Sequence, residues 1–492
     1  MTNILAIDQS TSATKALLFE SDGNLLDSAT LPHQQHYPQA GWVEHDAEEI
    51  YQNTLQVLQS LINKNNLPAS DATCLSITNQ RETIVVFDRE TGKPLYPAIV
   101  WQCRRGDPFC QQLIKDGHEE QVHQKTGLKI DTYFPASKLT WLLKNKPEIK
   151  EKLEQGEALI GTIDAYLIYR LTGGEVFATD HSNASRTLLF NITSLTWDNE
   201  LCELFQIPMG ALPDIRESST QFGKTDLDGI LSEAIPICGV MGDSQAALFA
   251  QRCFSQGEAK VTIGTGSSVL LNIGDELRYS QNGLLTAIGW VYQGKPTYAF
   301  EGIINYAGAT IVWLRDQLEL LRSSAETEVL SLSVEDNGGV YLVPAFVGLN
   351  APYWRSDIKA AILGLSPSTT RAHIARAALE SIAYQIKDVL ELMAEDAQTD
   401  LKMIRGDGGA VKNQFLMQFI ADISGIVARA SELPELSALG AVFAGTLGMG
   451  IYESLDELSA IPSHYIDYNP QLDQQSVDDL YAGWQSAVKQ IL

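Results

Sequence analysis

The sequence has few cysteines, no long apolar segment and no export signal. Its six cysteines (Cys74, Cys103, Cys110, Cys202, Cys238 and Cys253) are scattered and form no CxxC pair, which argues against zinc sites and disulfide frameworks. Residues 436–452 are uncharged but about one helical turn too short to span a bilayer, and four glycines interrupt them. No basic segment precedes the apolar N-terminal run. We therefore expect a cytoplasmic protein.

Positive charge is also scarce. The 492 residues contain 35 Lys and Arg against 61 Asp and Glu, a formal net charge of −26. Because phosphate backbones and anionic lipids are bound by clustered cations, nucleic acid and membrane partners are disfavoured. A small anionic ligand is still compatible with this charge, since backbone N–H groups and a metal ion can neutralise it locally. Hydrophobic residues make up 45% of the chain, which is typical of a soluble globular protein with two to four domains.

The common phosphate-binding motifs are missing. Gly223-Lys224-Thr225 ends like a P-loop, but Ser218 stands where that motif requires its first glycine. Gly264-Thr265-Gly266 lacks the third glycine of a dinucleotide fingerprint, and a strand pattern follows it where a helix should begin. Walker-type and Rossmann-type sites are therefore excluded.

Two strand–turn–strand patterns open the two halves of the chain. Residues 3–8 are mostly apolar and end in Asp8, residues 9–15 read as a polar turn, and residues 16–19 are apolar again. Residues 260–263, 264–268 and 269–273 repeat this order. Turns rich in Gly, Ser and Thr expose N–H and hydroxyl groups that can hold phosphate oxygens. Each turn alone is more typical of a plain hairpin, and it is the pair, with Asp8 at a strand end, that makes phosphate binding an equal alternative. The repetition indicates an internal duplication.

Helical patterns follow the hairpins and indicate an α/β protein. Residues 373–393 place apolar side chains on one face, and residues 437–447 are rich in Ala and Gly, which permits close helix–sheet packing. Residues 405–410 form a glycine-rich segment before a helical pattern at 415–423, typical of a strand–helix turn or of a ligand-binding turn. We predict two domains, residues 1–250 and 251–492.

Two polar motifs each have a functional and a structural interpretation. Asp243 follows an apolar run and could accept a proton from a hydroxyl nucleophile, or it could cap a helix. Arg81 and Glu82 could clamp a polyol, since a cation donates to hydroxyls and a carboxylate accepts from them, or they could form a surface ion pair. The histidines show no metal-ligand spacing. The residues alone leave both alternatives open.

Several longer stretches together resemble the FGGY carbohydrate kinases, and among them the glycerol kinases most closely. They are residues 76–82 (SITNQRE), 98–105 (AIVWQCRR), 179–186 (TDHSNASR), 242–249 (GDSQAALF), 343–354 (VPAFVGLNAPYW) and 407–418 (DGGAVKNQFLMQ). Residues 133–145 and 360–380 fit the two family signatures. The resemblance implies the two-domain, actin-like (ribonuclease H-like) ATPase fold, with a nucleotide cleft between the domains.

The resemblance also implies an activity and roles for individual residues. The enzyme would transfer the γ-phosphoryl group of ATP to a primary hydroxyl of glycerol, giving glycerol 3-phosphate, or of a related short polyol. Asp243 would be the general base, and Asp8 with Asp243 would hold Mg²⁺. The remaining roles would be acceptor binding by Arg81, Glu82, Trp101, Tyr133, Asp243, Ser244 and Ser268, and nucleotide binding by Thr11, Ser12, Lys15, Thr265, Gly308, Val312, Gly409 and Asn413. A homodimer or homotetramer is expected.

Some positions depart from the family pattern. Ser244 replaces a usual Gln and Ser268 a usual aromatic residue, so we expect a wider acceptor site. This favours, as an alternative, a kinase for a four- or five-carbon polyol or ketose such as erythritol or xylulose. Lys15 replaces Arg, and Val312 replaces a common Gln. A third possibility is a nucleotide-binding sensor without kinase activity, which the retained Asp8, Asp243 and Thr265 disfavour.

Overall fold

The computed structural model describes residues 2–355, 357–433, 435–463 and 465–492. Two compact units emerge, and neither is one continuous stretch of chain. Unit 1 comprises Met1–Arg252, Thr286–Tyr298 and Glu435–Pro462. Unit 2 comprises Cys253–Leu285, Ala299–Pro434 and Ser463–Leu492. The chain therefore passes between the units several times, whereas the predicted domains are two consecutive halves.

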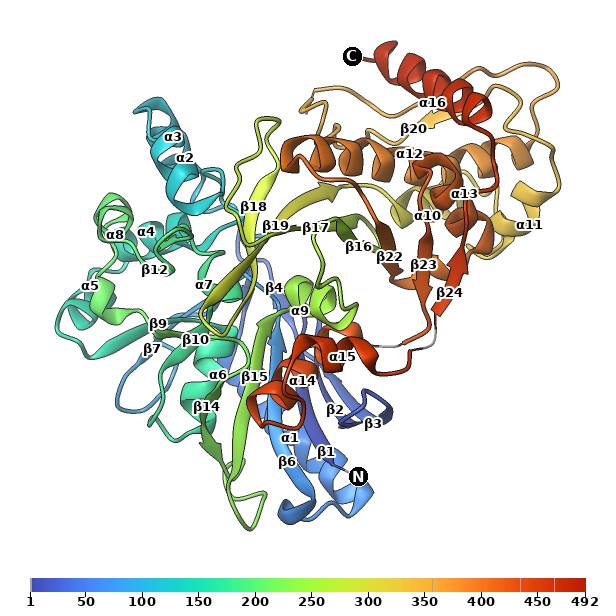
Figure 1. The fold of residues 1–492 in the computed structure, drawn as a ribbon. Coiled ribbons are helices and arrows are strands. Elements are labelled where there is room, and N and C mark those ends of the chain that lie inside the picture. Colours follow the sequence, from blue (N-terminus) through green and yellow to red (C-terminus); the bar gives the residue numbers. More distant parts are fainter. Residues whose placement is uncertain (1, 356, 434, 464) are drawn as a thin grey trace. The chain divides into compact units, whose positions relative to one another are not determined.

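A six-stranded sheet forms the centre of unit 1 (Figure 1). Its order is β14 (Gln221–Thr225), β15 (Ile235–Gly242), β6 (Ala72–Asn79), β1 (Asn3–Gln9), β2 (Ala13–Glu20) and β3 (Leu25–Pro32). Leu5 and Ile7 of β1 share a core with residues of α1 (Ala47–Asn65) and α6 (Ile163–Leu171). Since side chains alternate along a strand, Ile4 and Ala6 face the opposite side, and α14 (Leu436–Gly448) contacts the same strand. Helices thus cover both faces of this sheet.

Glycines let α14 approach its neighbours closely. A Cβ atom at Gly440 would clash with the carbonyl of Ala246 in α9 (Asp243–Ala250), and one at Gly445 would lie 2.7 Å from the carbonyl oxygen of Cys238 in β15. The close packing predicted from the Ala- and Gly-rich residues 437–447 is confirmed. It fixes β15 and α9, the two elements that meet at Asp243.

A second sheet and several short helices complete unit 1. The five-stranded sheet has the order β4 (Gln35–His36), β5 (Glu44–His45), β8 (Ala98–Ile99), β7 (Ile84–Asp88) and β9 (Ala158–Thr162). Two small ladders pair β10 (Ala178–Asp180) with β13 (Asp214–Arg216), and β11 (Phe190–Asn191) with β12 (Thr196–Trp197). The helices are α2 (Asp107–Lys115), α3 (Glu119–Thr126), α4 (Pro135–Asn145), α5 (Pro147–Glu154), α7 (His181–Ala184), α8 (Asn199–Phe205) and α15 (Leu455–Ala460).

Unit 2 is organised around a seven-stranded sheet. The order is β18 (Leu285–Tyr292), β19 (Lys295–Ile304), β17 (Ser267–Gly274), β16 (Glu258–Ile263), β22 (Met403–Asp407), β23 (Ala428–Ser431) and β24 (Tyr465–Tyr468). Residues 286–298, which belong to β18, β19 and the turn between them, are grouped with unit 1. A small ladder pairs β20 (Tyr341–Val343) with β21 (Ala361–Leu363). The helices are α10 (Gly308–Asp316), α11 (Glu326–Leu332), α12 (Arg371–Ala397), α13 (Gln414–Ser424) and α16 (Gln474–Lys489).

The two predicted hairpins exist and share one topology. β1 pairs antiparallel with β2 and parallel with β6, and β16 pairs antiparallel with β17 and parallel with β22. Both turns are shorter than predicted, because the strands continue into the polar residues: β1 extends to Gln9, and β17 already begins at Ser267. The repeated arrangement supports the duplication inferred from the sequence.

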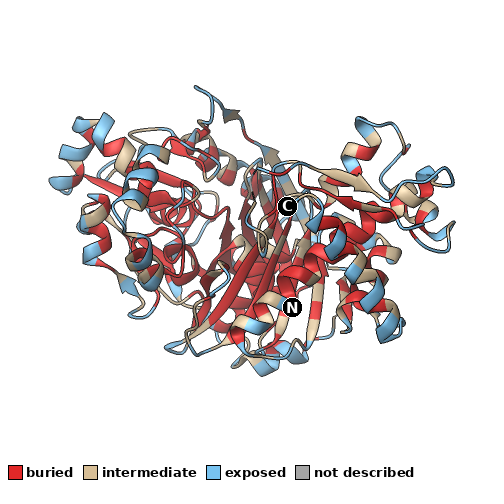
Figure 2. Cartoon of the chain, turned by 90° about the horizontal axis from the view of Figure 1, so that it is seen from above, coloured by how far each residue is buried: buried red, intermediate tan, exposed pale blue. Residues whose placement is uncertain are grey.

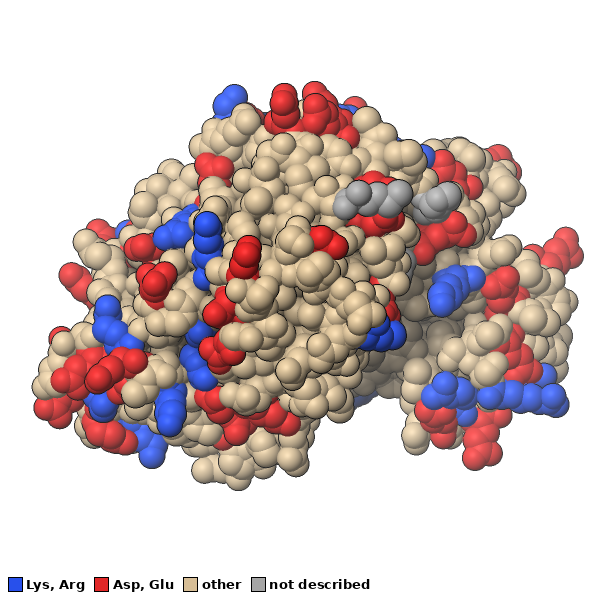
Figure 3. Space-filling view, turned by 90° about the horizontal axis from the view of Figure 1, so that it is seen from below, with Lys and Arg blue, Asp and Glu red and all other residues tan. Residues whose placement is uncertain are grey.

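Burial follows the layers within each unit. In Figure 2 the central strands are buried, and helices carry exposed residues on their outer sides. On the face drawn in Figure 3, Lys and Arg side chains are interspersed with Asp and Glu. Among the described residues, none of the helices has both the length and the apolar character needed to cross a bilayer.

Candidate active site

Asp8 is the second-to-last residue of β1 and lies close to the first turn, residues 10–12. It is 8% exposed, and burial raises the pKa of its carboxyl group to about 7, although the nearby Lys15 ammonium acts in the opposite direction. Lys15 Nζ lies 3.9 Å from Asp8 Oδ2 but only 2.6 Å from Glu435 Oε2. The lysine is thus paired mainly with Glu435, and Asp8 is a buried carboxylate that a further cation would keep ionised.

The first turn is held by side chains from other segments. Gln80 Nε2 donates to the carbonyl oxygen of Ser10 at 3.2 Å, and His33 Nε2 lies 2.9 Å from that of Thr11. Trp101 Nε1 donates to Thr11 Oγ1 at 3.1 Å. The turn that carries Thr11 and Ser12 is therefore tied directly to one of the aromatic residues predicted to bind the acceptor.

Asp243 is the first residue of α9, immediately after β15. Gly242 is the residue at the N-cap position, so the helix-cap interpretation of Asp243 is wrong. Arg81 Nε lies 3.1 Å from Asp243 Oδ1, and the backbone N–H of Ser244 donates to the same oxygen at 2.6 Å. With 39% of its side chain exposed, Asp243 combines a fixed position with access for a ligand.

Arg81 and Glu82 are buried, so the surface ion-pair interpretation is wrong. They are 6% and 1% exposed, and Glu82 adopts a left-handed backbone conformation (φ 63°). Arg186 Nε donates to Glu82 Oε1 at 2.5 Å, and Arg81 Nη1 donates to the side-chain oxygen of Gln245 at 3.1 Å. Buried carboxylates persist when cations and hydrogen bonds compensate them, and here two guanidinium groups do so.

A polar network from residues 179–186 supports these side chains, and its members had no predicted role. Ser182 Oγ accepts from the backbone N–H of Gly242 at 2.8 Å, directly before Asp243. The Asn183 and Asn79 side-chain amides pair with each other at 3.0 and 3.1 Å. Asn79 is the last residue of β6. In the sequence, only the family resemblance of residues 179–186 pointed to this segment, and it did not predict these hydrogen bonds.

Trp101 and Tyr133 meet edge to face. Their ring centroids lie 5.3 Å apart, and both residues are partly exposed. Two groups of contacts thus form in unit 1. One joins Thr11 to Trp101 and Tyr133, and the other joins Glu82, Arg81, Asp243 and Ser244. The charge of Asp243 also acts on Asp8.

Unit 2 contains a cavity of about 420 Å³. Five predicted nucleotide-binding residues line it, namely Thr265, Gly308, Val312, Gly409 and Asn413. Lining residues that had no predicted role are Ile263, Gly264, Ile311, Ser324, Ala325, Thr327, Glu328, Leu379, Ile382, Ala410, Lys412 and Leu416. Gly264 and Ala410 belong to the two glycine-rich turns that the sequence indicated. The others come from separate segments, and most of them are apolar or small, so no short motif pointed to a role for them.

Backbone segments approach each other closely at one end of this cavity. A Cβ atom on Gly308 would lie 2.5 Å from the carbonyl oxygen of Gly264, and one on Gly408 (φ 93°) would lie 2.5 Å from that of Ile263. A Cβ atom on Gly409 would meet no atom within 4 Å. The first two glycines therefore allow the turns to pack, whereas Gly409 leaves open space for a ligand.

The two serines that depart from the family pattern belong to different units. Ser244 is the second residue of α9 in unit 1. Ser268 lies on β17 in unit 2, where its Oγ is buried and makes no hydrogen bond with any residue that the structure describes.

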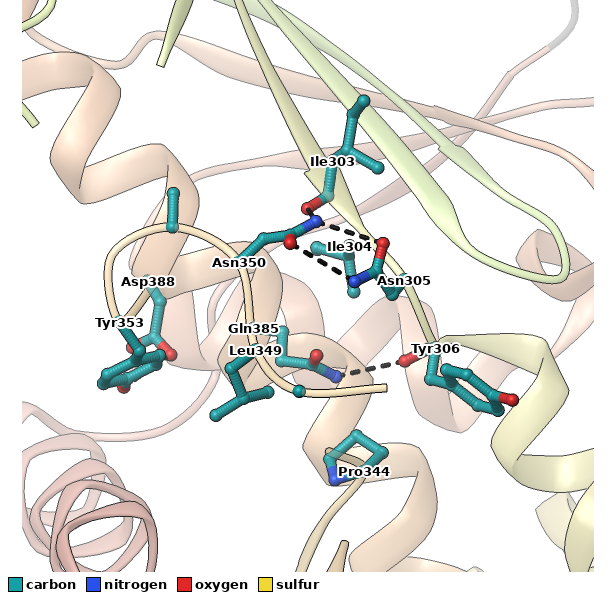
Figure 4. A pocket seen from close by; sticks show the side chains of 12 residues that line it. Ile303, Ile304, Asn305, Tyr306, Pro344, Leu349, Asn350, Tyr353, Gln385 and Asp388 are labelled. Atoms are coloured by element: carbon teal, nitrogen blue, oxygen red, sulfur yellow. Dashed lines mark hydrogen bonds between the residues drawn. The ribbon is translucent and has the colours of Figure 1, made fainter. Parts of the chain in front are cut away.

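A second hollow in unit 2 is too small for a substrate (Figure 4). It measures about 10 Å³, which is room for a single water. The side-chain amides of Asn305 and Asn350 pair beside it at 3.1 and 3.2 Å, and Gln385 Nε2 donates to the carbonyl of Tyr306 at 3.3 Å. The polar groups beside this small cavity thus bond to one another, and we assign it no ligand.

Comparison with known proteins decides the family. The FGGY family of carbohydrate kinases matches over residues 3–250 with its N-terminal domain and over residues 259–449 with its C-terminal domain. The chain belongs to the FGGY carbohydrate kinases. Its relatives include glycerol kinase 1 of Thermotoga maritima, 48% identical over 99% of each chain, and a glycerol kinase of Carboxydothermus hydrogenoformans, 48% identical over 99% of this chain and 97% of the relative.

Solved structures agree with this FGGY assignment. Glycerol kinase of Plasmodium falciparum, crystallised with ADP, has a TM-score of 0.95 and 38% identity, covering 100% of this chain and 98% of its own. A xylulose kinase of Lactobacillus acidophilus has a TM-score of 0.87 at 21% identity, which shows a common fold alone. The predicted α/β, two-domain, actin-like kinase fold is confirmed.

The acidic groups of this FGGY kinase suit a lightly coordinated divalent cation. Mg²⁺ keeps most of its waters and is held in kinases by one or two carboxylates together with substrate phosphates. Asp8 is a buried carboxylate whose charge is only partly compensated, and the charge of Asp243 is close enough to raise its pKa further. Among the described residues there is no cluster of three or more His, Cys, Asp or Glu that would form a closed metal cage.

Proposed function

We propose that this FGGY kinase transfers the γ-phosphoryl group of ATP to a primary hydroxyl of glycerol, giving glycerol 3-phosphate. The observation that carries the proposal is the setting of Asp243, an accessible carboxylate held by the buried guanidinium group of Arg81. Glycerol kinases at 45–48% identity over nearly the full length support the acceptor.

The acceptor is proposed to bind in unit 1. Arg81 donates N–H groups to the acceptor hydroxyls, while the carboxylate of Glu82 accepts from them. Trp101 and Tyr133 cover the C–H surface of the small polyol. The contacts of the Asp243 carboxylate with Arg81 and Ser244 both fall on Oδ1, so Oδ2 is the oxygen we expect to take the hydroxyl proton.

The nucleotide is proposed to bind in the 420 Å³ cavity of unit 2. The open backbone at Gly409 and the Gly264-Thr265-Gly266 turn suit close approach by phosphate oxygens. Asp8 and Asp243 would hold Mg²⁺, partly through water, and this ion supplies neutralisation of the phosphate charge. Thr11 and Ser12 of the first turn, and Lys15 of β2, would contact the phosphates.

The alternative acceptor is a four- or five-carbon polyol or ketose. Ser244 and Ser268 have smaller side chains than the residues usual in the family, which would leave room for a longer acceptor. The comparisons favour glycerol, because the similarity to xylulose kinases is confined to the fold.

An acceptor panel with ATP tests the proposal. We expect glycerol to give the highest kcat/KM when ADP release is followed with glycerol, erythritol and xylulose. Ser244→Gln is the matched variant, since it restores the residue usual in the family. If Ser244 widens the site, this variant lowers kcat/KM for erythritol but spares glycerol. A higher kcat/KM for erythritol or xylulose in the unaltered enzyme would overturn the glycerol assignment, and ATP consumption that ignores all acceptors would favour a nucleotide-binding sensor.

We also propose the cytoplasm as the site of action and a homodimer or homotetramer as the assembly. All six cysteines are buried free thiols, which supports a reducing compartment. The assembly rests on the family resemblance.

A further inference from the structure

Lys138 is a completely buried lysine that the proposed reaction does not use. It lies on α4 and is 0% exposed. Its Nζ donates to the backbone carbonyl oxygens of Tyr133 at 2.8 Å, Trp101 at 3.2 Å and Val100 at 3.3 Å. Both aromatic residues of the proposed acceptor site are therefore bound, through their backbones, to one ammonium group.

The match between donors and acceptors is complete. An ammonium group has three N–H donors and no acceptor, and here three carbonyl oxygens receive them. Lysine is almost never fully buried unless it is paired. Burial lowers the pKa of Lys138 to about 7, and the negative charge of Glu82 is the largest opposing influence. Burying a charged group costs free energy, and the three hydrogen bonds offset that cost here. A side chain without donors would leave the three carbonyl oxygens unsatisfied.

The segments that Lys138 joins come from different parts of unit 1. Trp101 follows β8, whereas Tyr133 lies in the turn before α4. The two rings touch at 5.3 Å, and the Trp101 indole also donates to Thr11 Oγ1. A displacement of either backbone would change the spacing of the rings and the contact with the first turn.

We infer that Lys138 is a positioning residue for acceptor binding, which sets the spacing of Trp101 and Tyr133 by holding both backbones. The inference rests on the proposed function, because it takes these two residues as the acceptor site. It adds a specificity-determining residue that does not itself touch the acceptor.

Two variants and a matched control test this role. Lys138→Met keeps the length of the side chain but removes all three donors. Lys138→Arg keeps the charge, but a planar guanidinium cannot direct three N–H groups at three converging carbonyls. Lys144→Met makes the same change at an exposed position of the same helix. For each protein, KM for glycerol, KM for ATP, kcat and the melting temperature are measured.

We expect Lys138→Met to lower kcat/KM for glycerol by about 10- to 100-fold, the size of effect that a misplaced binding group produces. KM for ATP should stay within about twofold, and Lys144→Met should match the wild type in all values. If Lys138→Met does not fold, Lys138→Arg must still raise KM for glycerol several-fold. A lower melting temperature with unchanged KM for glycerol in both variants would overturn the inference, leaving Lys138 a stability residue. Failure of the wild type to use any polyol would instead refute the proposed function.

Discussion

Replacing Asp243 by Asn separates the chemistry of this residue from its structural role. The amide oxygen of Asn can still accept from Arg81 Nε and from the Ser244 N–H, the two contacts of Asp243 Oδ1. The substitution removes the charge and replaces the basic Oδ2 by an amide group. Since the side chain is 39% exposed, the change leaves no buried group unsatisfied, and we expect the protein to fold.

The expected loss follows from the role of a general base. Proton abstraction by a positioned side chain contributes about 10²- to 10⁴-fold to the rate. At about 1.4 kcal/mol for each factor of ten, this is roughly 3–5 kcal/mol of barrier. The nucleotide cavity is lined by unit 2 residues and Asp8 remains as a carboxylate for Mg²⁺, so we expect the affinity for ATP to change much less than turnover.

Turnover is measured by ADP release with saturating glycerol and ATP, and nucleotide affinity by calorimetry. Asp116→Asn, at an exposed position of the same unit, is the control and should behave like the wild type. A purified Asp243→Asn enzyme that retains turnover within about tenfold of the wild type would refute the assignment of the base. A loss of turnover that only accompanies a loss of folding would show a structural role instead.

Two further predictions concern stability. Arg186→Met should leave the Glu82 carboxylate buried without its hydrogen-bonded guanidinium, at a cost of about 3–5 kcal/mol, or roughly 6–20 °C in apparent melting temperature. Arg315→Met, which breaks an exposed ion pair with Asp316, is the control and should change the melting temperature little. If Arg186→Met lowers the melting temperature no more than Arg315→Met does, the prediction is wrong. Burial raises the pKa of Asp388 to about 6 from an ordinary value near 3.8. The folded state therefore holds this proton more tightly, so the stabilising contribution is complete below about pH 4 and is lost as the pH rises through 6. Denaturant unfolding of wild type and Asp388→Asn should give a stability difference that falls by about 2–3 kcal/mol between pH 4 and pH 7, and parallel pH profiles would disprove it.

The sequence predicted those elements that local patterns specify. The strand–turn–strand segments and the helical periodicity at 373–393 correspond to β1–β2, β16–β17 and α12, with differences only at the ends. Strand ends were misplaced because polar residues such as Gln9 and Ser267 continue a ladder when a partner strand is present. The presence of a partner strand depends on the tertiary fold, and the residue types at the strand end do not reveal it.

The candidate site was harder to predict, because its support comes from distant residues. Arg186 reaches Glu82 across 104 positions of sequence, and Lys138 binds a carbonyl 38 positions earlier. Isolated arginines and lysines read as exposed, since that is where most of them lie. The family resemblance pointed to Asp243, Arg81 and Glu82, but only the fold shows why Glu82 can stay charged in the interior.

Local charge explains how so acidic a chain can accept an anionic substrate. The formal charge is −26 overall, yet in the proposed acceptor site the guanidinium groups of Arg81 and Arg186 stand against the carboxylates of Glu82 and Asp243. Buried charges interact in a medium of lower dielectric constant than water and are screened less by salt than surface charges. The charges closest to Asp243 therefore act on a ligand there more strongly than the distant acidic surface does. An acidic total charge limits which macromolecules bind, whereas phosphoryl transfer depends on the arrangement of a few interior groups.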